Sequence, residues 1–94
     1  MIVRIVTMYI QEIYLNDFKH IFCQIQPTIA SFDGCRSLKL LQSIDNPTVL
    51  TTYSVWESEA HLDAYRHSDF FSQTWKTVKP LFYQKTQAQT YTEQ

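Results

Sequence analysis

The 94-residue chain has one glycine, two cysteines and three prolines. A single glycine excludes a glycine-rich loop that binds phosphate through its backbone. Two cysteines without a recognisable signal sequence favour reduced thiols over a disulfide framework, which is typical of a cytoplasmic protein. No apolar stretch approaches the roughly 18 residues that a membrane-spanning helix needs, so we expect no membrane segment.

Charge of either sign is also sparse. Eight basic and nine acidic residues give a net charge of −1, with no long run of one sign. Nucleic-acid binding requires clustered lysine and arginine, so we expect no nucleic-acid partner. The basic residues Arg66, Lys76 and Lys79 are spread out and indicate a solvated face. Three scattered histidines and two unrelated cysteines match no zinc or iron pattern, and the sequence therefore predicts no metal site.

Apolar and aromatic residues are abundant. They make up 45% and 15% of the chain, with six Phe, six Tyr and two Trp. The length fits one domain over residues 1–94. So much apolar surface on a small domain indicates that part of it is buried against a second copy.

The hydrophobic pattern predicts four strands and two helical regions. β-branched runs, helical spacing of aromatics and turn residues place them at strands 2–10, 35–44, 48–56 and 83–92, and at helices that begin near 16 and at 59. The order is β-α-β-β-α-β, which is the ferredoxin-like α+β arrangement with an antiparallel four-stranded sheet. Asp45-Asn46-Pro47 carries turn chemistry and predicts a hairpin between the middle strands.

Single residues in the sequence indicate where the two helical regions begin, end and divide. Asn16 is a candidate N-cap of the first helix, and Pro27 is expected to kink or split it. Gly34 fits a left-handed residue at its end. Ser58 and Ser68 are candidate caps that divide the second helical region into pieces at about 59–66 and 69–79.

In this fold the helices cover one face of the sheet. The other face carries Val49, Tyr53 and Val55, together with Val3 and Ile5 or their opposite set on the first strand. No residues of this chain remain to cover it, so we expect a homodimer that packs sheet to sheet.

Several side chains allow two interpretations. Trp56 ends a strand where it either lines a pocket or fills the core. Tyr65 is a possible hydrogen-bond donor, or a core-edge tyrosine with a solvated hydroxyl. His67 precedes a helix cap and fits a surface imidazole better than a proton carrier. Arg4 reaches solvent, pairs with an acid or faces an anionic ligand, with pairing as the default. Cys23 fits a small core residue.

Two segments carry a resemblance to a known family. Val55-Trp56-Glu57-Ser58-Glu59, followed by Tyr65-Arg66-His67-Ser68-Asp69-Phe70-Phe71, resembles the antibiotic biosynthesis monooxygenase (ABM) family, and the Phe32-Asp33-Gly34-Cys35 turn matches its pattern too. The resemblance implies a dimeric α/β barrel with one ligand pocket per subunit between sheet and helices. Family members include cofactor-independent monooxygenases of quinols and polyketide aromatics, haem-degrading enzymes and domains with no known reaction.

The resemblance also implies site residues. Trp56 matches a strand-end Trp that borders the pocket. Thr7 stands where haem-degrading members carry Asn, and Trp75 where they carry the iron-ligating His, so no haem and no other cofactor is expected. Quinol-oxidising members often carry a His-x-x-Ser/Thr-x-His-like pattern, and the matching positions here hold Tyr65, Ser68 and Phe70, so both histidines of the pattern are missing. The expected pocket residues are Thr7, Phe22, Trp56, Phe71 and Trp75, with Tyr65 and His67 as candidate catalytic residues.

Two functions follow as expectations. The first is a cofactor-free monooxygenase that oxidises a quinol or phenolic substrate by deprotonating, desolvating and orienting it. The second is a non-catalytic, dimeric binding or stress-related domain that holds a small aromatic or apolar ligand in the same pocket.

Overall fold

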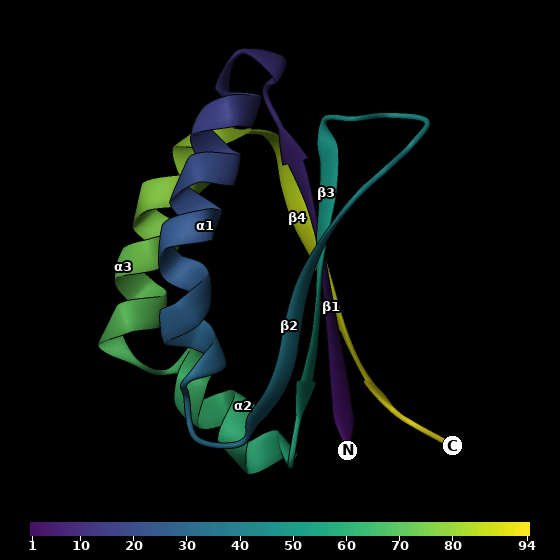
Figure 1. The fold of residues 1–94 in the computed structure, drawn as a ribbon, viewed down its shortest axis with the longest axis vertical. Coiled ribbons are helices and arrows are strands. Elements are labelled where there is room, and N and C mark those ends of the chain that lie inside the picture. The colour runs from purple at the N-terminus through teal and green to yellow at the C-terminus, as the bar shows by residue number, and fades with distance from the viewer.

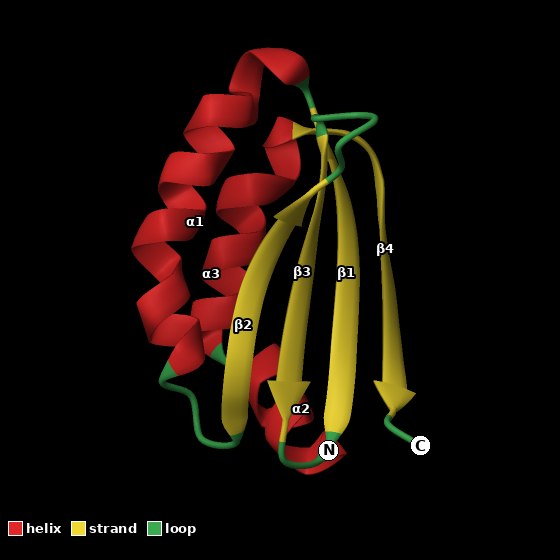
Figure 2. Ribbon diagram, turned by 45° about the vertical axis from the view of Figure 1, so that its right-hand side comes forward, coloured by secondary structure: helices red, strands yellow, loops and turns green.

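The computed structural model describes residues 1–94 as a layer of helices on one face of a four-stranded sheet (Figure 1). In chain order the elements are β1 (Ile2–Ile10), the 3₁₀ helix η1 (Glu12–Tyr14), α1 (Leu15–Ala30), β2 (Cys35–Gln42), β3 (Val49–Trp56), α2 (Glu59–Arg66), α3 (Asp69–Val78), the 3₁₀ helix η2 (Lys79–Leu81) and β4 (Phe82–Thr92). The strands run antiparallel in the order β2-β3-β1-β4, as Figure 2 shows. The predicted ferredoxin-like α+β fold is confirmed.

The predicted caps of the second helical region are confirmed. Ser58 accepts a hydrogen bond from the backbone N–H of His61, and Ser68 accepts one from that of Phe71. Each serine satisfies an amide that the first helical turn would leave unpaired. Gly34 has φ 83° as predicted, although it lies in the turn before β2 and not at the helix end, since α1 already ends at Ala30.

Three predictions about α1 are wrong: the N-cap at Asn16, a split at Pro27 and the burial of Cys23. The helix follows η1 directly and Tyr14 occupies the cap position, so Asn16 is not the N-cap. The helix also continues through Pro27, which lies in the last turn with its side chain exposed. Proline has no N–H to donate to the carbonyl oxygen of Cys23, four residues earlier. Because Cys23 is exposed, water can bind this carbonyl oxygen instead. Cys23 is an exposed free thiol and not a core residue.

The helices cover the inner face of the sheet, and on this face the central strand β3 has large side chains at its two ends and small ones between them. The end rows are Ile2 with Trp56, and Met8 with Leu50. The middle rows are Leu38, Ser54, Arg4 and Thr90, and Leu40, Thr52, Val6 and Ala88. Because side chains alternate between faces, all of these point toward the helices. The short side chains of Thr52, Ser54 and Ala88 in these rows leave space between sheet and helices.

The buried core divides accordingly into two clusters. One cluster packs the end of the sheet near the start of α1, and it comprises Met8, Ile10, Phe18, Phe22, Leu50 and Val78. The other packs the end near α2, and it comprises Ile2, Ile29, Trp56 and Leu62. The space above the middle rows lies between these clusters.

The outer face of the sheet carries no helix (Figures 1 and 2). Val3, Ile5, Tyr53 and Tyr91 line a shallow depression on it. No helix of the chain is both long and apolar enough to cross a membrane.

Candidate functional site

A cavity of about 770 Å³ lies between the inner face of the sheet and the helices. It is lined by 25 residues, 16 of them hydrophobic. The small side chains Thr52 and Ser54 of β3 form part of its floor, and Phe22 of α1 contributes to its wall. A volume of this size and an apolar lining are typical of pockets that hold a small organic ligand.

Aromatic rings form the wall of the pocket at the end beside α2. Trp56 is only 1% exposed, and its Nε1 donates to Ser54 Oγ at 3.0 Å. The rings of Trp56 and Tyr65 stack with centroids 5.1 Å apart and planes inclined by 22°. Phe71 meets Tyr65 edge-on at 5.1 Å, and Trp75 lies 6.0 Å from Phe71. Trp56 thus belongs mainly to the core and borders the pocket beside Tyr65.

The structure brings five of the predicted site residues together in the pocket lining: Phe22, Trp56, Tyr65, Phe71 and Trp75. It places two elsewhere. Thr7 pairs with Thr51 in the β1–β3 register, one position out of step with the inward-facing Val6, and therefore lies on the outer face. His67 follows α2, is exposed, and holds its Nδ1 2.7 Å from the carbonyl oxygen of Asp63. Neither Thr7 nor His67 lines the pocket.

The chemistry of Tyr65 follows from its burial. Desolvation, with a smaller contribution from the nearby Cys35 thiol group, raises the pKa of Tyr65 to about 12. The phenol therefore keeps its proton at neutral pH and is suited to donate a hydrogen bond rather than to accept a proton. No histidine, aspartate or glutamate lines the pocket.

Four charged residues line the pocket, and all are basic: Arg4, Arg66, Lys79 and Lys85. The default expectation that Arg4 pairs with an acid is wrong, because no ion pair includes it. Its Nη1 instead donates to Thr90 Oγ1 at 2.7 Å. Partial burial, and then the positive charge of Arg66, hold the pKa of Arg4 below its usual value, while Asp63 opposes this shift. Arg66 and Lys79 do not simply form a solvated helical face, since both contribute to the pocket.

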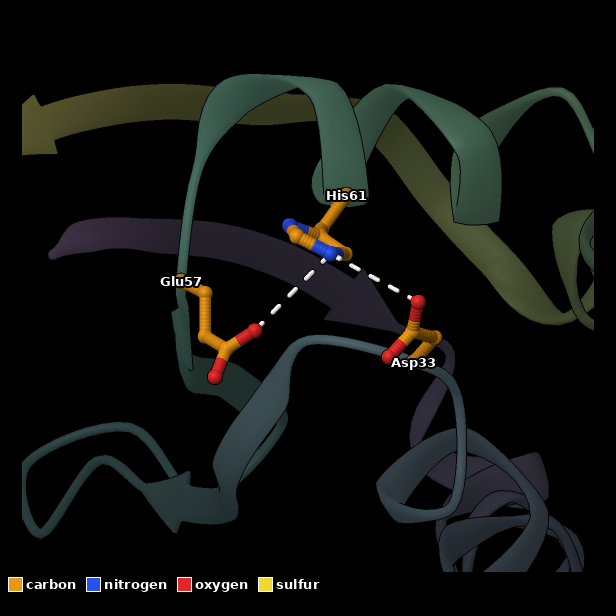
Figure 3. Close-up of side chains that lie close together, drawn as sticks. All are labelled: Asp33, Glu57 and His61. Carbon is orange, nitrogen blue, oxygen red and sulfur yellow. Dashed lines mark ion pairs between the residues drawn. The ribbon is translucent and has the colours of Figure 1, made fainter.

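A second polar cluster lies outside the pocket, where the turn before β2 meets the start of α2. His61 Nε2 lies 3.6 Å from Asp33 Oδ2 and 3.8 Å from Glu57 Oε2, and Figure 3 shows the imidazole directed between the two carboxylates. These three residues are the group in the chain that could hold a metal ion. However, the Asp33 side chain is 97% exposed and Glu57 already pairs with Arg36. We interpret the cluster as ion pairing that ties the turn to α2.

The chain is similar to known proteins in sequence and in fold. The family model for antibiotic biosynthesis monooxygenase matches residues 1–77. No curated protein matches the chain significantly.

Solved structures match over nearly the whole chain. A conserved protein from Methanosarcina mazei Go1 is 20% identical with a TM-score of 0.92, covering 100% of this chain and 94% of its own. Rv0793 from Mycobacterium tuberculosis is 18% identical with a TM-score of 0.90, covering 99% and 94%. A "putative antibiotic biosynthesis monooxygenase" from Bordetella bronchiseptica is 26% identical with a TM-score of 0.87, covering 98% and 95%.

Proposed function

The chain belongs to the antibiotic biosynthesis monooxygenase family, and on this premise we propose that it is a cofactor-independent monooxygenase of a small aromatic substrate, a quinol or another phenol. The observation that carries the proposal is the aromatic wall of Trp56, Tyr65, Phe71 and Trp75 around a cavity of about 770 Å³. Aromatic rings prefer offset-stacked and edge-on contacts with other rings, and this wall offers both to a planar ligand.

The reaction places modest demands on the protein. Deprotonation makes a phenol or quinol electron-rich enough to react with dioxygen. One oxygen atom then bonds to the activated carbon in place of two hydrogens, and the other leaves as water. The pocket contributes orientation against the aromatic wall and exclusion of bulk water. Tyr65 contributes a hydrogen bond from its protonated hydroxyl to a substrate oxygen, which favours developing negative charge there.

The substrate proton leaves to solvent in this proposal, because the pocket lining has no side chain suited to accept it. Ala88 and Lys85 of β4 line the pocket and are also exposed, so water reaches the site along this strand. His67 has no part in the transfer, since it lies outside the pocket.

Haem and metal ions have no part in the proposal. Trp75 lies in the pocket, and an indole offers no lone pair to iron. The lining also has neither histidine nor cysteine. A Soret band with a defined endpoint on haem titration would contradict this expectation.

We further propose that the active form is a homodimer. The uncovered outer face carries an apolar centre with Val3, Ile5, Tyr53 and Tyr91. A second copy that packs its own outer face against this one buries these side chains in a self-complementary interface.

Oxygen uptake tests the activity. The protein is mixed with a panel of a substituted hydroquinone, menadiol and a tricyclic phenolic anthrone in an oxygen electrode. Ala88→Trp fills the pocket from β4, and Lys76→Trp adds the same side chain at an exposed α3 position outside the lining. We expect uptake that is lost in Ala88→Trp and kept in Lys76→Trp. No uptake above the protein-free rate with any substrate would contradict the proposal.

A second function is favoured by one observation, the absence of a proton acceptor in the pocket lining. A binding domain needs the aromatic wall and no such group. A copurified aromatic ligand, found by native mass spectrometry and returned unchanged after incubation in air, would favour binding without turnover.

A further inference from the structure

The charges of the pocket differ from those of the whole chain. The chain has nine acidic and eight basic residues, yet the charged residues of the pocket lining are four basic residues and no acidic one. Half of the basic residues therefore surround one apolar cavity. Gathering like charges around a low-dielectric space is unfavourable unless an anion offsets them.

Arg4 is the most informative of the four. It lies in a middle row of the inner face between Ser54 and Thr90, and its row is next to the one that carries Trp56. Its one side-chain hydrogen bond is the 2.7 Å contact with Thr90 Oγ1, and no carboxylate lies within 4.0 Å. A guanidinium has five N–H donors, so most of them remain for a ligand in the pocket.

Arg66 adds a second guanidinium at the same end. It follows Tyr65 on α2 and lines the pocket, and its only ion pair is a 3.6 Å contact with Asp63, in which both side chains are substantially exposed. Arg66 is close enough to Arg4 to lower the pKa of that guanidinium, in addition to the effect of burial. Lys79 and Lys85 are exposed on η2 and β4, and we assign them no specific contact.

We propose that the pocket takes its aromatic ligand as an anion, with a carboxylate or ionised phenol oxygen held by Arg4 and Arg66 while the ring packs against Tyr65 and Phe71. This rests on the proposed function, because it names the class of aromatic substrate. Planar guanidinium groups bind carboxylate and phenolate oxygens through charge-assisted hydrogen bonds. Two nearby cations also lower the pKa of a bound phenol. The phenol can then lose its proton although no side chain of the pocket acts as a base.

Calorimetric titration under nitrogen tests the proposal. The probes are naphthoate and naphthamide, which have the same shape and differ in charge. Naphthoate is expected to bind the wild type at least about tenfold more tightly, since hydrogen bonds to charged groups contribute ~1.5–3 kcal/mol. Arg4→Gln and Arg66→Gln should each weaken naphthoate about tenfold or more and leave naphthamide unchanged. Lys76→Gln removes a charge outside the pocket and should leave both affinities as they are.

A third probe distinguishes the two sources of the anion. If the site favours phenolates, bound naphthol ionises at a lower pH in the wild type than in Arg4→Gln. If naphthoate is preferred and naphthol ionises at its solution value, the anion is a carboxylate. Either result supports the proposal.

Equal affinity for naphthoate and naphthamide, or no binding of either, would overturn it. So would an Arg4→Gln variant that binds both probes equally weakly, because that is the behaviour of a structural residue. Thermal unfolding checks that Arg4→Gln is folded, and Arg66→Gln, at an exposed helix position, repeats the test if it is not. The probes are not oxidised under nitrogen, so the outcome is independent of whether the protein consumes oxygen.

Discussion

Tyr65 is the residue that joins the pocket wall to the core. Its ring stacks on Trp56 and meets Phe32 and Phe71 edge-on at centroid distances of 5.0 and 5.1 Å. This burial is the main reason why the pKa of Tyr65 rises from an ordinary 10.0 to about 12. The folded state therefore retains the phenolic proton at a pH where the unfolded chain loses it.

The stability of the protein should depend on Tyr65 at high pH. With the folded pKa above the unfolded one, the stabilisation is fully present below about pH 10 and is lost as pH rises through about 12. Between about pH 8 and about pH 11 the wild type should lose roughly 1 kcal/mol more unfolding free energy than Tyr65→Phe. Urea unfolding measures this difference. Tyr83→Phe, at an exposed position of β4, should behave like the wild type, and equal pH profiles for wild type and Tyr65→Phe would contradict the assignment.

Gly34 should tolerate no side chain. Its φ of 83° disfavours other residues, and an added Cβ would lie 2.3 Å from His61 Cγ. Gly34→Ala should therefore cost more than about 1 kcal/mol of unfolding free energy. Combined with His61→Gly, which removes every side-chain atom that the new Cβ would meet, the added cost of Gly34→Ala should fall to about 1 kcal/mol for the backbone alone. Chemical denaturation of the four proteins measures both values, and strictly additive effects would contradict the steric explanation.

The sequence predicted some of these residues better than others. Trp56, Phe71 and Trp75 were predictable because a strand end and a helical stripe put them on one side of the fold. The pairing of Asp33, Glu57 and His61 was not, because a turn, a strand end and a helix bring them together only in three dimensions. For Arg4 the sequence leaves an acid, solvent and an anionic ligand as alternatives, because what faces its side chain depends on β4 and α2, which are distant in the chain.

The strands explain why a cavity forms at all. On the inner face of β3 the sequence runs from Leu50 through Thr52 and Ser54 to Trp56, so two small polar residues separate two large apolar ones. This alternation is visible in the sequence, and it is a signal from which a pocket between two core clusters could have been predicted. Thr7 was assigned to the pocket by resemblance alone, whereas the period of two puts it on the other face.

The two serine caps should stabilise α2 and α3 measurably. Ser58→Ala and Ser68→Ala should each lower the unfolding free energy by about 1 kcal/mol, because each leaves a first-turn N–H without its partner. Ser72→Ala, at an exposed position inside α3, is the matched control and should change stability little. If denaturant unfolding shows equal effects at positions 58, 68 and 72, the caps do not define these helices.

Helix α1 shows the limit of local rules. Proline inside a helix predicts a kink, but Pro27 lies in the last turn on the exposed side, where little remains to be broken. Phe22 and Ile29, on either side of Pro27 in the sequence, both pack into the buried core, and the helix runs unbroken to Ala30. Whether α1 continues past Pro27 depends on these tertiary contacts, which the sequence does not show.

The whole molecule has one covered and one uncovered sheet face, and the uncovered face should form a dimer. Light scattering at micromolar concentration should give twice the 11.2 kDa of the chain. Tyr53→Glu should give a monomer, because Tyr53 pairs with Ile5 at the centre of this face and a buried unpaired carboxylate is costly. Gln73→Glu, on the exposed surface of α3, should remain dimeric. A monomeric wild type would contradict the interface.

The central claim is that this pocket lets dioxygen oxidise a phenolic substrate without a cofactor. Its most direct test is mass spectrometry of the product formed from the anthrone under heavy-isotope dioxygen, with metal-free protein. The account predicts one heavy oxygen atom in each product molecule, at a rate that falls to the protein-free background in Ala88→Trp. Product that carries no heavy oxygen, or that forms equally fast in Ala88→Trp and the wild type, would contradict it.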